Sequence, residues 1–169
     1  MREQAREHLT SYPHIHITGD LNSLLAQHFD IIFCLEVFEH LPPEVRRENL
    51  MILSNLVKRE GMVVLGIPNE IFIPALLKGV LRMARRYGED DARLGNVLRA
   101  FMGIPPRERP VVSFDGLPYI LRHMGFDYRE FIKEVNDVFR IMDRYGSPFP
   151  ALPLLLNFEI YLKCVLPQD

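Results

Sequence analysis

Residues 29–41 read FDIIFCLEVFEHL, and this stretch decides the fold class. Its first half, Phe29 to Leu35, is a short apolar run with a β-branched centre, a pattern typical of a strand buried on both faces. Its second half carries Glu36, Glu39 and His40. Ligands bind at the carboxyl ends of strands in open α/β sheets, so these polar residues are candidates for a functional site.

The segments on either side of this stretch alternate between helical and strand patterns. Residues 1–12 predict a short helix, residues 14–18 (HIHIT) a strand, residues 42–58 a helix and residues 61–67 (GMVVLGI) a second buried strand. This alternation favours an α/β fold. We expect a mostly parallel twisted sheet with right-handed crossovers and helices on both faces.

The second half of the chain follows a different pattern. Residues 71–86 predict an apolar helix with a basic end, residues 92–102 a further helix and residues 103–112 a proline-rich loop. We interpret residues 70–112 as a helical insertion or lid within a single domain, 1–169. Beyond it we expect a helix over 115–124, a strand over 126–135, a loop over 144–153 and an antiparallel closing strand over 157–166.

The composition limits the class of protein. The chain has 169 residues and a net charge of -2, so it lacks the basic footprint of a nucleic-acid-binding domain. Cys34 and Cys164 lie in apolar runs and are interpreted as buried thiols of a reducing compartment. No secretory signal and no apolar stretch of spanning length are recognised, so a cytoplasmic protein is expected. Contact of residues 71–86 with a membrane surface is a weaker alternative to a core-facing helix with a basic end.

Three segments together resemble the class I S-adenosylmethionine-dependent methyltransferases. Residues 29–41 are similar to the fourth strand and following turn of that family, residues 58–69 (KREGMVVLGIPN) to its fifth strand, and Gly19-Asp20 to the end of its third strand. The resemblance implies a Rossmann-like fold. It also implies transfer of a methyl group from S-adenosylmethionine to a hydroxyl, amine or similar acceptor on a small molecule.

The resemblance also assigns residues to the site. It implies that the cofactor lies along Asp20, Leu21, Cys34, Leu35 and Glu36, and that Pro68 and Asn69 form the substrate rim. Glu36, Glu39 and His40 are the candidate catalytic residues, with His40 as the better candidate for a general base. The alternative for Asp20 is a plain turn residue after a strand.

The spacing of Glu36, Glu39 and His40 raises the question of a metal. If the segment is helical, the three side chains share one face. Metal-dependent relatives in the family have the same spacing, and there a divalent ion coordinates the substrate hydroxyls. Those relatives supply a further histidine after the fifth strand. No histidine lies between His40 and His123, which we expect to end a helix, so we predict no metal and regard this set as a secondary option.

One departure from the family weighs against catalysis. The glycine-rich loop after the family's first strand is absent, since no two closely spaced glycines precede residue 60. Only glycine lets a backbone come that close to the cofactor. We therefore expect a fold without its first strand or strands. A truncated or degenerate module without catalysis, serving in protein interaction or as a homodimer, is the alternative to an enzyme.

Overall fold

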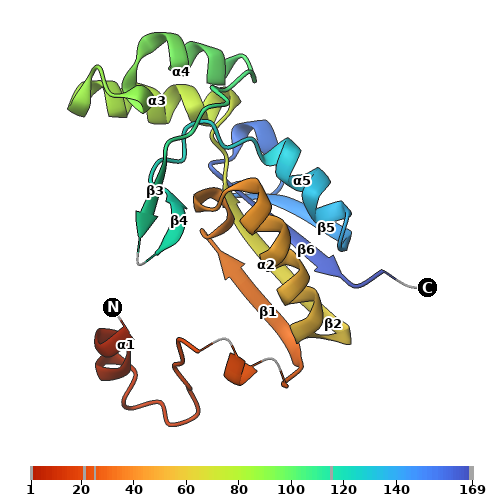
Figure 1. The fold of residues 1–169 in the computed structure, drawn as a ribbon. Helices are drawn as coiled ribbons and strands as arrows, with labels where there is room; N and C mark the ends of the chain where they lie inside the picture. The colour runs from red at the N-terminus through yellow and green to blue at the C-terminus, as the bar shows by residue number, and fades with distance from the viewer. Residues whose placement is uncertain (1, 21, 25, 115, 168–169) are drawn as a thin grey trace.

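The computed structural model describes residues 2–20, 22–24, 26–114 and 116–167. The predicted N-terminal helix is confirmed as α1 (Arg2–His8), and a 3-10 helix, η1 (Asn22–Leu24), follows it. Figure 1 shows this N-terminal segment (red) leading into the amino end of the first strand. The predicted strand over residues 14–18 is wrong, because those residues pair with no strand and lie in turns and irregular chain.

The main sheet has four strands in the order β1-β2-β6-β5. The predicted strands β1 (Phe29–Leu35) and β2 (Val57–Pro68) are confirmed and pair in parallel. The helix α2 (Pro43–Leu56) connects them, as predicted. The closing strand β6 (Glu159–Val165) pairs antiparallel with β2, and β5 (Arg140–Ser147) pairs antiparallel with β6. The fold is therefore α/β with a mixed sheet, parallel at its start and antiparallel later.

One face of the sheet holds the main core. Alternate residues of the central strands, such as Val63 and Leu65 in β2 and Leu162 in β6, are fully buried. They form one cluster with Leu50 of α2 and Phe131 of α5 (Tyr128–Asn136), so both helices cover this face (Figure 1). Among the described residues the helices therefore cover one face of the sheet rather than the predicted two.

The opposite face corrects the prediction that β1 is buried on both sides. Ile31, Phe33 and Leu35 are 55%, 65% and 46% exposed. Side chains alternate between the two faces of a strand, so residues of the other parity, Ile32 and Cys34, pack against the core. The apolar run alone cannot show whether a second layer covers the outer face.

Three further predictions in the second half are corrected. The predicted helix over 115–124 is instead the strand β4 (Leu117–Ile120), which pairs with β3 (Val111–Phe114) in a hairpin. The predicted strand over 126–135 is the helix α5, in which Tyr128, Phe131 and Val135 are buried at helical spacing. Its N-cap Asp127 accepts a hydrogen bond from the Arg129 N–H. Part of the predicted loop 144–153 is β5.

The helices α3 (Phe72–Arg86) and α4 (Leu94–Phe101) confirm the predicted helical content of residues 70–112. With the 3-10 helix η3 (Asp90–Ala92) they form a layer at one end of the sheet, called here the cap (Figure 1). Ala75, Val97, Ala100 and Met124 form a small core of their own there. No helix among the described residues is long and apolar enough to cross a membrane.

Close contact between α3 and α4 depends on Gly79. A Cβ atom at this position would lie 2.4 Å from Val97 Cγ1. We expect Gly79→Ala to lower the free energy of unfolding by about 1–3 kcal/mol through overpacking, measured by urea denaturation followed by circular dichroism. Gly95→Ala is the matched control, since nothing lies within 4 Å of its added Cβ. It should be neutral or raise stability by up to about 1 kcal/mol. Equal effects of the two substitutions would contradict the predicted packing.

Candidate functional site

The parallel pairing of β1 and β2 brings two strand ends to one edge of the sheet. Leu35 is in register with Gly66, just before β2 ends at Pro68. The next residue, Glu36, donates its N–H to the Gly66 carbonyl oxygen at 2.9 Å and has a φ of 54°. This left-handed conformation is uncommon for a residue other than glycine. It turns the chain off the sheet, so that the 3-10 helix η2 (Phe38–His40) follows the strand ends directly.

Phe38 anchors η2 in the core, and this places the neighbouring Glu39 in the interior. The Phe38 side chain is 1% exposed, and its ring centroid lies 5.0 Å from that of Phe131. Glu39 is fully buried, and neither carboxylate oxygen has a hydrogen-bond partner among the described residues. Burial, together with the nearby Glu36 carboxylate, raises the pKa of Glu39 to about 8. Buried carboxylates without partners are uncommon in stable proteins, so this one requires an explanation in terms of function.

His40 presents a defined nitrogen to Glu39. Its Nδ1 lies 2.7 Å from the Ile120 carbonyl oxygen, and its ring stacks on Tyr119 at a centroid distance of 4.7 Å. A carbonyl oxygen only accepts, so Nδ1 carries the proton and Nε2 of the neutral ring keeps its lone pair. Nε2 lies 3.5 Å from Glu39 Oε1. The hairpin β3–β4 thus fixes both the position and the tautomer of His40.

His123 joins this pair from the segment between β4 and α5. Its Nε2 lies 3.1 Å from His40 Nε2 and 3.9 Å from Glu39 Oε1. The expectation that His123 ends a helix is wrong, because residues 117–120 form a strand and His123 lies in irregular chain. Burial lowers the pKa of His123 to about 4, so its ring is neutral near pH 7.

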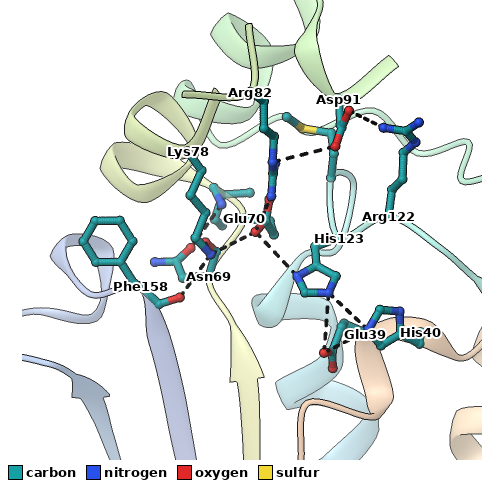
Figure 2. Close-up of polar contacts among 12 residues, drawn as sticks. Glu39, His40, Asn69, Glu70, Lys78, Arg82, Asp91, Arg122, His123 and Phe158 are labelled. Carbon is teal, nitrogen blue, oxygen red and sulfur yellow. Dashed lines mark hydrogen bonds and ion pairs between the residues drawn. The ribbon is translucent and has the colours of Figure 1, made fainter. Parts of the chain in front are cut away.

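A buried ion-pair network connects His123 to the cap (Figure 2). Glu70 Oε1 lies 4.0 Å from His123 Nδ1, and the Glu70 side chain is fully buried. Lys78 and Arg82 of α3 donate to the Glu70 carboxylate at 2.9 and 2.8 Å. Burial alone would raise the pKa of Glu70, but these two cations hold it below its usual value. Arg82 also pairs with the buried Asp91 in η3.

Comparison with known proteins identifies the architecture. A scan of protein-family models and a search of curated proteins found no match. A search of solved structures found an S-adenosylmethionine-dependent methyltransferase from Clostridium acetobutylicum ATCC 824 with a TM-score of 0.56 and 12% identity; the match covers 98% of this chain and 71% of that one. A second match, at TM-score 0.54 and 12% identity, is the glycopeptide N-methyltransferase MtfA complexed with S-adenosyl-L-homocysteine, covering 96% of this chain and 68% of that one.

The chain has the fold of S-adenosylmethionine-dependent methyltransferases. At this identity the likeness establishes the architecture alone.

Within this methyltransferase fold, Glu39 and His40 lie together. Glu36 is exposed at the turn, but its carboxyl group is near enough to Glu39 to raise the pKa of that residue. One ligand atom from each of Glu39, His40 and His123 lies within 4.8 Å of the others. The residues that lie together therefore differ from the predicted metal option of Glu36, Glu39 and His40, because His123 takes the place of Glu36. With His123 in place of Glu36, a buried carboxylate without partners and two imidazole nitrogens fit a divalent cation.

The predicted cofactor-binding residues do not lie together on one face of the sheet. Asp20 lies in a segment without a strand, so its expected position at a strand end is wrong; Leu21 lies outside the described residues. Cys34 is half-buried beneath the sheet face, and burial raises the pKa of its thiol to about 11. Leu35 is 46% exposed on the opposite face. Their contact with a cofactor stays a prediction.

Of the two predicted rim residues, Pro68 is the buried last residue of β2 and Asn69 follows it directly. Asn69 is fully buried, and its Nδ2 donates to the carbonyl oxygens of Leu154 and Asn157. Its Oδ1 accepts from the Ile71 N–H. These bonds occupy the Asn69 side chain and fix the chain where it leaves Pro68 for α3. The direct role of Asn69 here is therefore to position Glu70 and the cap.

Sequence reasoning missed Glu70 and His123. Glu70 follows the predicted rim residues immediately, so an acidic side chain directly after a buried strand was an available signal. His123 lies 83 residues from His40, and only the folded hairpin and the turn after it bring the two rings together.

A cavity of about 700 Å³ borders this cluster through Arg109 and Ile120, which contact Glu39 and His40. Four arginines line it, but none of Glu39, His40 and His123 does. Three of the four are engaged in structural contacts: Arg46 with Glu134, Arg129 with Asp127, and Arg109 with the Glu39 carbonyl oxygen. We therefore attribute the polar lining of this cavity to structural contacts around α5 and the start of α2.

Proposed function

We propose that this chain is a methyltransferase domain that transfers a methyl group from S-adenosylmethionine to a hydroxyl, amine or similar nucleophile on a small molecule. One observation supports the proposal above the others: the buried Glu39 and the half-buried His40 and His123 form a cluster beside the strand ends of a methyltransferase fold. In open α/β sheets, ligands bind beside the carboxyl ends of strands.

The chain's own residues would contribute positioning and proton transfer. Methyl transfer is an in-line displacement, so holding acceptor and methyl group in line is the main task of the protein. His40 is oriented by the Ile120 carbonyl, and its Nε2 lone pair can accept the acceptor's proton. If an ion is bound instead, Glu39, His40 and His123 would hold it, the His40 Nε2 lone pair would be a ligand rather than a base, and the ion would lower the pKa of an acceptor hydroxyl.

A second candidate is a non-catalytic interaction module that forms a homodimer. The observation that favours it is the exposed apolar face of β1, where Ile31 and Phe33 are more than half exposed. β1 also lies at the edge of the described sheet, and an edge strand offers unpaired backbone groups to another chain.

Calorimetric titration separates the two candidates. For the methyltransferase we expect S-adenosyl-L-homocysteine to bind the folded chain with micromolar affinity, because the product shares the adenosine and homocysteine parts of the cofactor. A sample that is folded by circular dichroism but releases no heat at millimolar ligand would contradict cofactor binding by this chain. Light scattering on the same sample then measures its oligomeric state, where a stable dimer would support the interaction module.

A further inference from the structure

We infer that His123 is the third ligand of a divalent-cation site with Glu39 and His40, and that Glu70 orients His123 from the cap, so that ion binding and cap docking are coupled. The role of the ion in methyl transfer rests on the proposed function, but ion binding by these residues does not.

The geometry of the two imidazoles matches shared coordination. Zinc–nitrogen bonds of about 2.0–2.1 Å place adjacent ligand atoms of one ion roughly 3 Å apart. The Nε2 atoms of His40 and His123 lie 3.1 Å apart, and His40 Nε2 lies 3.5 Å from Glu39 Oε1. His40 is restricted to the tautomer that ligation needs, because Nδ1 donates to Ile120.

Glu39 supplies the independent observation. Its side chain is fully buried and both carboxylate oxygens lack a hydrogen-bond partner among the described residues. Its Oε1 lies 3.5 Å from His40 Nε2 and 3.9 Å from His123 Nε2. A buried carboxyl group either keeps its proton or has its charge compensated by a partner or a metal, and a cation between these three groups would compensate the carboxylate.

The ligand set favours a particular class of ion. Two imidazoles and one carboxylate suit zinc, manganese, cobalt or iron, whereas calcium and magnesium prefer sets of oxygen ligands. Three protein ligands leave at least one coordination position open, as in catalytic rather than structural metal sites. An acceptor oxygen could take that position.

Glu70 supplies the coupling to the cap. A ligating His123 must carry its proton on Nδ1, and Glu70 Oε1 is the acid beside that atom, at 4.0 Å. Histidine ligands of metals commonly donate their other ring nitrogen to such a carboxylate. Glu70 is in turn held by Lys78 and Arg82 of α3. Shortening the Glu70–His123 contact on ion binding would therefore tighten α3 on the site.

The experiment uses the chelator-treated full chain and two probes, Mn²⁺ and Co²⁺, followed by calorimetry and, for Co²⁺, by visible absorption. We expect 1:1 binding with a Kd below about 100 μM. Glu39→Gln and His123→Asn should each weaken binding at least tenfold. Glu70→Gln should weaken it by about 10–100-fold, the usual effect of losing an outer carboxylate.

Hydrogen exchange gives the readout for coupling. Addition of Mn²⁺ should slow exchange of the amides in residues 72–86 in the wild-type chain, and this slowing should be lost in Glu70→Gln. Glu134→Gln is the matched control: it removes an acid paired with Arg46 that takes no part in the cluster. We expect it to leave ion affinity unchanged.

Three results would overturn the inference, provided the variants are folded by near-UV circular dichroism. Absence of Mn²⁺ and Co²⁺ binding at 1 mM removes the site. Unchanged affinity in His123→Asn removes His123 as a ligand, which leaves a simple hydrogen bond between the two imidazoles. Unchanged affinity and exchange in Glu70→Gln removes the coupling. Binding of the ion without binding of S-adenosyl-L-homocysteine would instead refute the proposed function and leave the site intact.

Discussion

Replacement of Phe131 by alanine is expected to lower the free energy of unfolding by about 3–5 kcal/mol, the usual effect of truncating a buried aromatic residue. The Phe131 side chain is fully buried in α5, and its ring lies 5.0 Å from Phe38 and 5.8 Å from Phe126, between ring centroids. The cavity would remove contacts between α5 and the helix η2 that carries Glu39. Urea denaturation measures the loss. It is followed by near-UV circular dichroism of the tyrosine and phenylalanine side chains, since the chain has no tryptophan.

Phe33→Ala is the matched control for this prediction. Phe33 is the same residue type in the same fold, but it is 65% exposed on the outer face of β1. We expect a change in unfolding free energy within about 1 kcal/mol, because little area is removed from water at this position. A large loss in Phe33→Ala would show that its face is covered in solution, for example by a second copy of the chain.

The second large effect is a pH dependence of stability caused by Glu39. Burial raises the pKa of Glu39 in the folded, metal-free chain from 4.5 to about 8. The folded state therefore binds a proton that the unfolded state has already lost, and stability falls as the pH rises between these two values. Each unit of pKa difference corresponds to about 1.4 kcal/mol, so Glu39→Gln should stabilise the chain at pH 8 by an amount on the order of a few kcal/mol.

Measurement of this effect requires a difference between two proteins. His123 acts in the opposite sense, because burial lowers its pKa from 6.5 to about 4 and stability from this group rises with pH over that interval. Chemical denaturation of wild type and Glu39→Gln at pH 5 and pH 8, with chelator present, isolates the contribution of Glu39. Parallel pH profiles of the two proteins would show that Glu39 is ionised and compensated in the folded state. Glu60→Gln, at an exposed position, controls for the loss of one acid.

The two effects have a common structural origin. The core around Phe38 and Phe131 stabilises the position of η2, and that position places Glu39 in the interior without a partner. Stability lost at Glu39 is the kind of local cost that functional sites retain because it serves binding or chemistry. The same packing places His40 between the β3–β4 hairpin and His123.

Local sequence patterns determined the elements whose burial is decided by neighbours in the chain. The apolar runs 29–35 and 61–67 became strands, and the helices 43–56, 72–86 and 94–101 formed within the predicted segments. The polar residues directly after the first strand make Glu39 and His40 candidates for the site, and their role stays a prediction. The strand and helix predictions succeeded because hydrophobic periodicity is a property of short segments.

Tertiary structure alone decided the rest, since it depends on which distant segments meet. The short apolar patterns at 115–135 suit either a helix or a strand, and pairing with Val111–Phe114 selected the strand at Leu117–Ile120. Residues 14–18 alternate as a strand does, yet they lack a partner strand in the described sheet. The site itself depends on the contact between His123 and His40, which are 83 residues apart in the sequence, and on the ion pair between Glu70 and α3. No local pattern encodes such a meeting, because its free energy comes from the packing of the hairpin, the cap and η2 against one another.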